Sequence, residues 1–414
     1  MHYSSAPVVG GVESVMREHS LLFTRAGYPV TIFSGRGEQV DEQVSFQKIK
    51  LFNSSAARIL AIREELDKGI IPPEFDQAVS DILRILEIVL NPFDVVIAHN
   101  ICSLHKNLPL TAALQTYILE NRSMKLISWD HDLAWTNDQY RSQLIDAYPW
   151  KLLKETWHPT RHQHVTVSQM RKNEMVNLLG DDAPDVTAIP SGIDWHALLR
   201  LDAQALDIIQ TYDLMHAYPV LFLPARITRR KNLEIAISIT AALKAFYPSI
   251  ALLISGPLGP HNPKNRIYFD ELKTLTDQYK LNQPKEKGQE KVIFLADYDN
   301  RFLPMDTIYD LFRFTDALLF PSFQEGFGIP ILEAGMVGMP IFCSEIAPFH
   351  ETANSNAHFF NPEGNPEAIA REIHQIIEGD KTLNHKHRVK QQYTWNNIFK
   401  NQIEPLVSKL ETKE

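Results

Sequence analysis

The chain has 414 residues, of which 44% are hydrophobic and 22% are charged, and its formal net charge is -9. This length is too great for one compact core and predicts two domains, while the composition is that of a soluble globular protein. The negative charge argues against a general nucleic-acid binder and against a strongly basic membrane-surface protein.

Cysteine usage and hydropathy indicate the compartment. Cys102 and Cys343 lie far apart inside apolar stretches. Two cysteines are too few for a disulfide framework and have no metal-ligand spacing, so we expect buried free thiols in a reducing compartment. No run approaches the roughly 20 apolar residues of a spanning helix, and the N-terminus has no secretory pattern. The sequence therefore predicts a cytoplasmic protein.

Short apolar runs alternate with longer helical patterns along the chain. Residues 1–7 have the character of the end of a first strand, which is either very short or truncated at its start. The further predicted strands are residues 29–35, 94–100, 125–130, 164–168, 185–192, 220–225, 250–256, 291–297, 317–322 and 340–345. Such alternation is typical of βαβ units and parallel sheets, and so many strands exceed one ordinary doubly wound sheet.

A break between the two sets of strands follows IPSGID at residues 189–194, because residues 195–219 lack strand character. We predict an α/β fold with a Rossmann-like domain at 1–195, a second at 196–385, and a helical segment at 386–414 that packs back on the first domain. Ligands of open parallel sheets bind beyond the carboxyl ends of the strands, so two doubly wound domains are expected to face each other across a cleft.

The stretch EGFGIPILEAG at residues 325–335 follows a predicted strand and enters a helix near Pro330. Gly326 and Gly328 would let the backbone approach a ligand, and helix-start N–H groups bind anions. Glu325 is expected in the loop and Glu333 in the first helical turn. Carboxylates accept paired hydrogen bonds from diols, so each glutamate would suit one sugar. The structural alternative is that both merely favour the helix dipole.

Two further loops carry charge or glycine. PARITRRKN at residues 224–232 contains Arg226 and Lys231, which would supply the positive charge that a diphosphate needs, while Arg229 and Arg230 are expected on a solvated face. A basic loop taken alone is weak evidence of function. PVVGGVE at residues 7–13 contains Gly10 and Gly11, which would let the backbone approach the same phosphates, although ordinary tight turns also use Gly-Gly.

Together these motifs resemble the family-four retaining glycosyltransferases, which have the two-Rossmann GT-B fold. The resemblance covers nearly the whole chain through GGVE, IPSGID, ARITRRKN, ISGPLG and PSFQEGFGIPILEAGMVGMP, and the E-x7-E element from Glu325 to Glu333 is its most specific part. It implies that Glu325 contacts the donor sugar and Glu333 the ribose, and that Arg226 and Lys231 bind the diphosphate. The other implied donor-binding residues are Gly10, Gly11, Gly256, Gly326, Phe327 and Gly328.

Histidines in the first domain have alternative interpretations. Asp130-His131-Asp132 matches the metal-binding D-x-D of the other glycosyltransferase fold, but the two-domain pattern argues against that fold. We prefer His131 as a residue that contacts the donor sugar, with a structural loop histidine as the alternative. His99 and Asn100 are candidate acceptor contacts. His162 and His164 share one face of a strand without a third metal ligand nearby and are expected to be strand-edge polar residues.

The expected function is transfer of a hexose from a nucleotide diphosphate sugar to an acceptor hydroxyl with retention. His131, Glu325, Arg226 and Lys231 are the expected catalytic residues, without metal or cofactor. Cationic contacts would stabilise the leaving diphosphate, and no nucleophile is paired with a base, which favours a same-face mechanism. A nucleotide-sugar epimerase and an inactive sugar-nucleotide-binding module are the alternatives. A sugar phosphorylase would need a lysine-bound pyridoxal phosphate, and the sequence shows no convincing motif for it.

The expected partners are a nucleotide sugar donor and an acceptor that the sequence does not identify. The acceptor is a saccharide, a lipid-linked compound or a small molecule, and nucleic acid is not expected. A peripheral membrane contact and the oligomeric state stay open.

Overall fold

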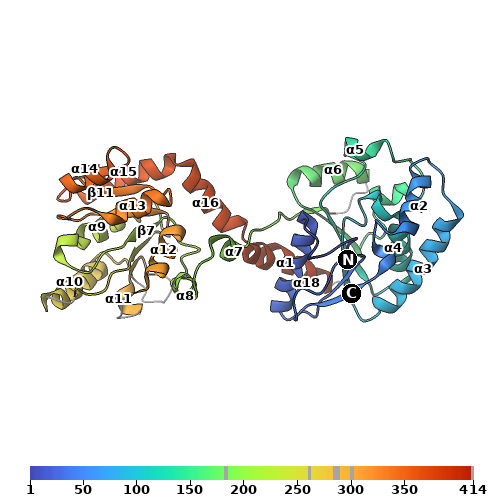
Figure 1. Cartoon of the computed structure of the whole chain (residues 1–414), viewed down its shortest axis with the longest axis horizontal. Coiled ribbons are helices and arrows are strands. Elements are labelled where there is room, and N and C mark those ends of the chain that lie inside the picture. Colours follow the sequence, from blue (N-terminus) through green and yellow to red (C-terminus); the bar gives the residue numbers. More distant parts are fainter. Residues whose placement is uncertain (181–184, 260–262, 283–289, 299–302, 412–414) are drawn as a thin grey trace. The chain divides into compact units, whose positions relative to one another are not determined.

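The computed structural model describes residues 1–180, 185–259, 263–282, 290–298 and 303–411. The chain forms two compact units, one of Met1–Ile193 with Tyr393–Glu414 and the other of Asp194–Gln392 (Figure 1). The segment predicted at 386–414 is thus divided between the two units at residue 393. Among the helices in the described ranges, none combines the length and apolarity needed to span a bilayer.

The first unit contains two parallel sheets. One has the strand order β3-β4-β5-β6, and the other pairs β1 with β2. The strands are β1 (Thr31–Ser34), β2 (Ser45–Lys48), β3 (Val95–His99), β4 (Lys125–Asp130), β5 (His162–Thr166) and β6 (Thr187–Ala188). The helices are α1 (Gly11–Arg25), α2 (Ala57–Leu66), α3 (Pro73–Val89), α4 (Leu108–Glu120), α5 (Asp138–Arg141), α6 (Gln169–Leu179), α17 (Trp395–Ile398) and α18 (Glu404–Glu411), with short turns η1 (Lys50–Phe52), η2 (His105–Asn107), η3 (Trp150–Lys154) and η6 (Phe399–Ile403).

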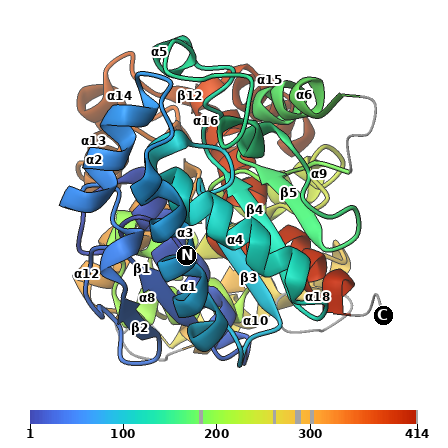
Figure 2. The ribbon, with the colours of Figure 1, turned by 90° about the vertical axis from the view of Figure 1, so that its right-hand side faces the viewer.

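Helices cover both faces of the four-stranded sheet. Leu126 of β4 packs into a core with residues of α3 and α4, which lie over the sheet in Figure 2. The neighbouring Ile127 points to the opposite face and packs with residues of α1, α17 and α18. Successive strand side chains alternate between faces, so this division is the pattern of a doubly wound sheet. The C-terminal helices therefore belong to the core of the first unit.

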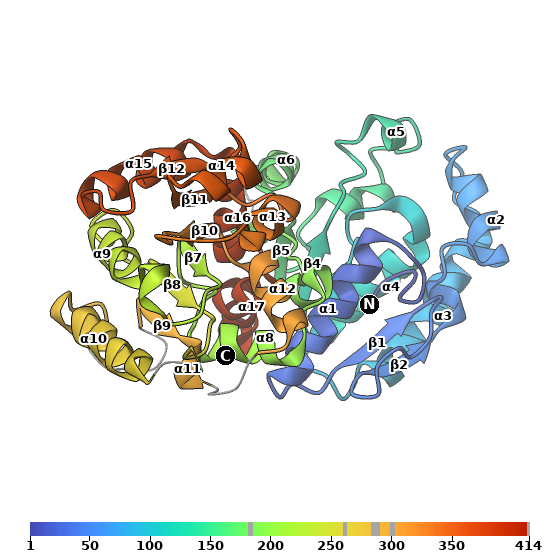
Figure 3. The same cartoon turned by 60° about the vertical axis from the view of Figure 1, so that its left-hand side comes forward.

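The second unit is built on one parallel sheet with the order β12-β11-β10-β7-β8-β9, which can be followed in Figure 3. Its strands are β7 (Val220–Leu223), β8 (Ala251–Ile254), β9 (Val292–Phe294), β10 (Ala317–Phe320), β11 (Ile341–Ser344) and β12 (His358–Phe360). The helices are α7 (Trp195–Leu199), α8 (Ala203–Thr211), α9 (Leu233–Leu243), α10 (Lys264–Gln278), α11 (Leu295–Tyr298), α12 (Met305–Phe314), α13 (Ile329–Met336), α14 (Ala347–Ala353), α15 (Pro366–Gly379) and α16 (Lys381–Gln392), with the turn η5 (Arg229–Lys231).

Strand order in this second sheet creates one special position. β7, β8 and β9 follow one another toward one edge, while β10, β11 and β12 follow one another toward the other. The direction of winding therefore reverses between β7 and β10, and the loops after these two strands leave the sheet on opposite sides. Open parallel sheets bind their ligands at such a switch point, beyond the carboxyl ends of the strands.

The predicted α/β fold with parallel sheets is confirmed, and every strand predicted from residue 29 onward overlaps an observed one. Cys102 and Cys343 are free and buried, as expected. The prediction that His162 and His164 are strand-edge residues is wrong. β5 lies between β4 and β6, both imidazoles are buried, and their ring centroids are 4.2 Å apart on one face.

Candidate functional site

Lys231 and Glu325 form an ion pair at the switch point of the second unit. Lys231 ends η5 after β7, and Glu325 lies in the loop after β10, so the pairing of these strands brings the two side chains together. Lys231 is only 9% exposed. Burial lowers the pKa of the Lys231 ammonium, and the Glu325 carboxylate raises it in opposition. Lys231 is therefore a cation that is largely shielded from solvent and paired with the Glu325 carboxylate.

Arg230 adds a second cation to the same carboxylate. Its guanidinium lies 3.4 Å from Oε2 of Glu325 and donates to the carbonyl of Gln324 at 3.3 Å. The Arg230 side chain is 55% exposed, in agreement with the predicted solvated face, but the prediction did not include its contact with Glu325. Arg229 does lie on the solvated side, where it pairs with Glu234 and Glu271.

Gly256 positions the backbone beside Arg226. Gly256 follows β8, and a Cβ on it would lie 2.0 Å from the carbonyl oxygen of Ala225 and 2.4 Å from the nitrogen of Arg226. Only glycine permits this approach between two loops. Gly256 is buried, whereas the Arg226 side chain is exposed. The structure thus gives Gly256 a packing role in holding the loop that carries Arg226.

The two glycines around Phe327 differ in their surroundings. A Cβ on Gly326 would meet no described atom within 4 Å, whereas one on Gly328 would lie 2.9 Å from the Phe349 ring. Gly328 also has φ +103°, a left-handed conformation that favours glycine, and it directly precedes α13. The hydroxyl of Thr352 donates to the carbonyl of Phe327 at 2.5 Å. Gly328 thus allows the left-handed turn before α13, whereas the space beside the Cα atom of Gly326 is open.

Glu333 lies deeper in its helix than predicted. α13 begins at Ile329, so Glu333 is its fifth residue and has no place in the first turn. The cause is the left-handed Gly328, which ends the loop immediately before Ile329 and moves the helix start ahead of Pro330. Partial burial raises the pKa of the Glu333 carboxyl above its usual range.

Gly10 and Gly11 lie at the start of α1 in the first unit. Gly10 precedes the helix, and a Cβ on it would lie 2.1 Å from a carboxylate oxygen of Glu13. Glu13 is buried and accepts a 2.5 Å hydrogen bond from the Ser4 hydroxyl. A Cβ on Gly11 would meet no described atom within 4 Å. The absence of a side chain at Gly10 therefore leaves room for the Glu13 carboxylate, while Gly11 borders open space at the helix start.

His131 is held by the two residues that end β3 and follow it. Oδ1 of Asn100 accepts hydrogen bonds from the backbone nitrogens of His131 at 2.8 Å and Asp132 at 3.3 Å. Nδ1 of His99 lies 3.2 Å from Nε2 of His131. His99 and Asn100 are 3% and 4% exposed, which leaves them little surface for the acceptor contact that the sequence suggested. Their contacts instead fix the His131 loop.

Burial also determines the charge of this histidine. It lowers the pKa of His131 to about 4, with His2 nearby acting in the same direction. The imidazole is therefore neutral near pH 7 and presents a hydrogen-bonding nitrogen rather than a positive charge.

The Asp130-His131-Asp132 sequence does not assemble a carboxylate pair. Asp130 is fully buried on β4, where the Ser128 hydroxyl donates to it at 3.0 Å. Asp132 instead pairs with Arg171 of α6 at 3.0 Å. No group of three or more His, Cys, Asp or Glu side chains suited to a metal ion occurs in the part of the chain that the structure describes.

Substitution of Asn100 tests how the His131 loop is supported. Asn100 has φ +55°, so Asn100→Gly keeps the backbone conformation and removes only the side-chain acceptor. We expect it to cost about 1–3 kcal/mol of stability through the two amides left unpaired. Asn100→Ala adds about 1–2 kcal/mol of left-handed strain. Denaturant unfolding of both variants measures the difference, and equal stabilities would contradict the strained conformation.

Both halves of the chain match known protein families. Residues 9–196 match the family described as Glycosyltransferase Family 4, and residues 207–393 match the one described as Glycosyl transferases group 1. Each match coincides with one of the two compact units, apart from the C-terminal helices.

Curated relatives and solved structures give further similarities. The chain is 25% identical over 300 residues to mannosylglucosylglycerate synthase of Petrotoga mobilis, covering 69% of this chain and 68% of the relative. It is 24% identical to O-antigen chain mannosyltransferase B of Escherichia coli, covering 64% of each. Sucrose-phosphate synthase of Thermosynechococcus elongatus is similar at a TM-score of 0.39 and 15% identity, covering 100% of this chain and 96% of that one.

Proposed function

Since this chain belongs to the glycosyltransferases of the Family 4 and group 1 type, we propose that it transfers a hexose from a nucleotide diphosphate sugar to an acceptor hydroxyl with retention of configuration. The buried Lys231–Glu325 pair at the switch point of the second unit is the observation that carries the proposal. Several relatives are named mannosyltransferases, and we propose mannose as the transferred sugar.

The cations would act on the leaving diphosphate. As the bond between sugar and phosphate breaks, negative charge accumulates on the phosphate oxygens, and preorganised cations stabilise it most strongly where water is excluded. Lys231 supplies such a cation from a buried position, and the exposed Arg226 would clamp a phosphate with two bonds. Arg230 is a third cation close to the same carboxylate.

Glu325 would accept hydrogen bonds from the hydroxyl groups of the transferred sugar. Its Oε1 accepts a hydrogen bond from Lys231, whereas the contact of its Oε2 within the described part of the chain is the longer one of 3.4 Å to Arg230. Oε2 can therefore accept a hydrogen bond from a hydroxyl without breaking the Lys231 pair. Glu333 would bind the ribose, and the open space at Gly326 would let the backbone approach the donor.

The proposed reaction exchanges one bond for another on the same face of the sugar. The bond between the anomeric carbon and the diphosphate breaks, the acceptor oxygen bonds to that carbon, and the acceptor proton passes to the leaving phosphate oxygen. Neutral His131 would hydrogen-bond the sugar near the reacting carbon, with Asn100 and His99 as positioning residues. This exchange of bonds and of one proton needs no cofactor.

Donor turnover tests the proposal directly. The protein is incubated with GDP-mannose, UDP-glucose and UDP-galactose, with and without simple saccharide acceptors, and nucleotide diphosphate release and product configuration are measured. We expect acceptor-dependent release with a mannosyl donor and a product of unchanged anomeric configuration. An isomerised free sugar would instead indicate an epimerase. Donor binding without nucleotide release would indicate an inactive sugar-nucleotide-binding module, and an inverted product a different mechanism.

The neighbouring glycines provide a matched pair of variants. Gly326→Ala places a methyl group in open space, so we expect unchanged thermal stability but about tenfold weaker donor binding, equivalent to about 1.4 kcal/mol. Gly328→Ala must adopt φ +103° and approach Phe349, so we expect it to lose about 1–3 kcal/mol of stability. Thermal unfolding and donor titration distinguish the two, and a comparable loss of stability in both would contradict the open space at Gly326.

A further inference from the structure

A cation without a counter-charge lies beyond the carboxyl end of β3 in the first unit. Lys106 belongs to η2, and its Nζ lies over the ring of Tyr140 of α5, 4.3 Å from the ring centroid. The Lys106 side chain is half-buried, yet it forms no ion pair with a carboxylate among the described residues. A cation that is partly removed from water in this way gains free energy when an anion binds to it.

Arg63 of α2 places a second positive charge beside Lys106. α2 lies against η2, and burial together with the charge of Arg63 lowers the pKa of the Lys106 ammonium. The Arg63 side chain is also half-buried, and its guanidinium has no hydrogen bond or ion pair in the part of the chain that the structure describes. Two like charges held close together repel each other, and a bound oxyanion would neutralise both.

Two carboxylates act on Lys106 without pairing with it. The charges of Asp67 and Asp132 raise the pKa of Lys106, in opposition to burial and to Arg63. Asp67 is exposed, and Asp132 is already paired with Arg171 at 3.0 Å. The two cations are therefore only partly compensated by the charges around them.

His105 holds this cluster in place without adding charge. An amide oxygen only accepts, so Nε2 of His105 donates to Oε1 of Gln143 at 2.7 Å. The imidazole also packs edge-on against Tyr140 at 5.1 Å between ring centroids. Burial lowers the pKa of His105, so the ring is neutral near pH 7. The Tyr140 ring that supports the Lys106 ammonium is thus itself held in position.

The cluster adjoins the loop that carries His131. The backbone nitrogen of Ala134 donates to the carbonyl of Ser103 at 2.9 Å, which joins the loop after β4 to the loop after β3. Both loops leave the carboxyl ends of paired parallel strands, where open sheets bind their ligands. A cation pair at this edge can therefore hold one end of a small molecule whose other end reaches His131.

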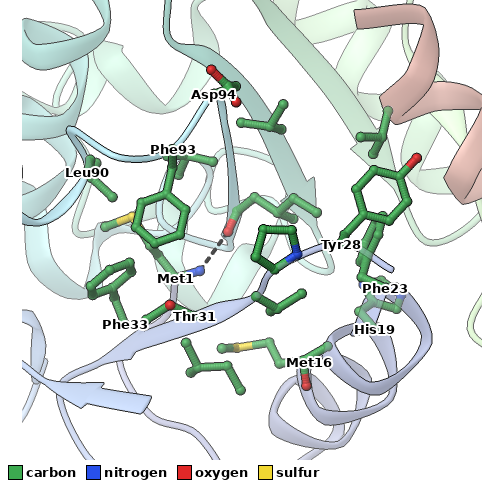
Figure 4. Close-up of a pocket in the computed structure, with 18 of the residues that line it drawn as sticks. Met1, Met16, His19, Phe23, Tyr28, Thr31, Phe33, Leu90, Phe93 and Asp94 are labelled. Atoms are coloured by element: carbon green, nitrogen blue, oxygen red, sulfur yellow. Dashed lines mark hydrogen bonds between the residues drawn. The ribbon is translucent and has the colours of Figure 1, made fainter. Parts of the chain in front are cut away.

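A cavity of about 270 Å³ that residues of β1 and β3 line offers no comparable charge. Its wall includes the rings of Tyr28, Phe33 and Phe93 (Figure 4). None of the described residues that line it is a lysine or an arginine. Within the first unit, an anionic ligand would therefore favour Lys106 over this cavity.

Building on the proposed function, on which this inference rests, we propose that Lys106 and Arg63 form an oxyanion site that binds a phosphate or carboxylate group of the acceptor. The Arg63 guanidinium can hold two oxygens of such a group, and the Lys106 ammonium adds a point charge. The acceptor is thus an anionic compound, and its charged group orients the hydroxyl that receives the sugar. Neither cation takes part in the exchange of bonds described above.

Anion binding without donor tests the site by itself. Glucose, glucose 6-phosphate and glucuronate share one ring and differ in charge, and inorganic phosphate is the simplest probe. We expect the three anions, but not glucose, to raise the denaturant midpoint of the first unit, followed by its tryptophan fluorescence. Lys106→Met and Arg63→Met should each weaken this binding about tenfold. The stronger of the two sugar anions identifies the bound group as phosphate or carboxylate.

Two control variants locate the effect. Lys68→Met removes an exposed cation that pairs with Glu65 after the same helix, so anion binding should stay unchanged. Lys231→Met removes a cation of the second unit that is expected to bind the donor diphosphate. Stabilisation of the first unit by anions should persist in this variant.

Transfer kinetics connect the site with the acceptor. With a donor that the protein turns over, we expect kcat/KM to be at least about tenfold higher for an anionic sugar than for glucose. Lys106→Met should raise the KM for that acceptor about tenfold and leave the KM for the donor unchanged, because the charge binds the acceptor and not the leaving group.

The possible results separate this inference from the proposed function. Absence of stabilisation by all three anions, or anion binding that survives Lys106→Met, would overturn the oxyanion site. Transfer to glucose as efficient as transfer to both anionic sugars would overturn it while leaving the proposed function intact. Anion binding that depends on Lys106 in a protein that turns over no donor would support the site and contradict the proposed transfer.

Discussion

Replacement of Lys231 with methionine is expected to lower the rate of sugar transfer by about 10²- to 10³-fold. Methionine has a similar length and keeps the packing against the Phe320 ring, which lies 4.9 Å from the Lys231 nitrogen, but it carries no charge. The loss should fall mainly on kcat, since the charge on the diphosphate increases as the sugar departs. Steady-state kinetics with the preferred donor measure this effect.

Arg229→Met is the matched control for this prediction. Arg229 belongs to the same short turn, yet its side chain is 63% exposed and pairs with Glu234 and Glu271. We expect its substitution to change transfer by less than about twofold, because surface ion pairs contribute little. Equal losses in Lys231→Met and Arg229→Met would contradict a specific role for the buried cation and would indicate a general electrostatic effect.

The stability of the Lys231 variant carries separate information. The Glu325 side chain is about 10% exposed, and without Lys231 its remaining ion pair among the described residues is the longer contact to Arg230. Breaking a buried pair on one side costs up to about 3–5 kcal/mol. We therefore expect Lys231→Met and Glu325→Gln each to lower the melting temperature, and the double variant to lose less than the sum. A loss of transfer in the double variant with near-native stability would separate the chemistry from the fold.

The first unit is expected to lose stability as the pH falls from 7 to 5. Burial lowers the pKa of His19 to about 3, that of His2 and His131 to about 4, and that of His99 well below its usual value. In the unfolded chain these groups bind protons near pH 6.5. Between about pH 6.5 and 4 the unfolded state thus binds more protons, and acidification favours unfolding by about 1.4 kcal/mol per pH unit for each such histidine.

His19→Phe isolates one of these contributions. The His19 ring packs edge-on against Trp129 at 4.5 Å and Trp395 at 5.4 Å between centroids, so phenylalanine can keep the packing. Neither ring nitrogen has a hydrogen-bond partner among the described residues. We expect a gain of about 1 kcal/mol at pH 7 from removing the unsatisfied nitrogens, and about 2 kcal/mol more at pH 5 from removing the titration.

Tryptophan fluorescence in denaturant follows this effect selectively, because Trp195 is the only one of the 6 tryptophans in the second unit. His216→Gln is the control, since His216 is exposed in the second unit and pairs with Asp213 at 2.6 Å. A His19→Phe protein with the same pH dependence as the parent chain would contradict the burial of a neutral imidazole at this position.

Local pattern predicted the strands that lie in apolar runs of about five residues and missed β2 and β12. β7, β8, β10 and β11 are buried throughout and appear in the sequence as short apolar runs. β2 is largely exposed and reads Ser-Phe-Gln-Lys, which has no apolar run, and β12 has only three residues. The pairing of β2 with β1 is a tertiary contact that leaves no periodic signal in its own residues.

The sequence by itself determined the parallel α/β class and the residue types at the strand ends, because hydrophobic period and turn chemistry are local properties. Tertiary structure alone decided that Lys231 meets Glu325, which lies 94 positions later, since the pairing of β7 with β10 follows from strand order. It also decided that Arg230 joins them and that His99 and Asn100 are buried in contact with His131. Strand order and burial depend on contacts between distant segments, and no single stretch of the chain encodes them.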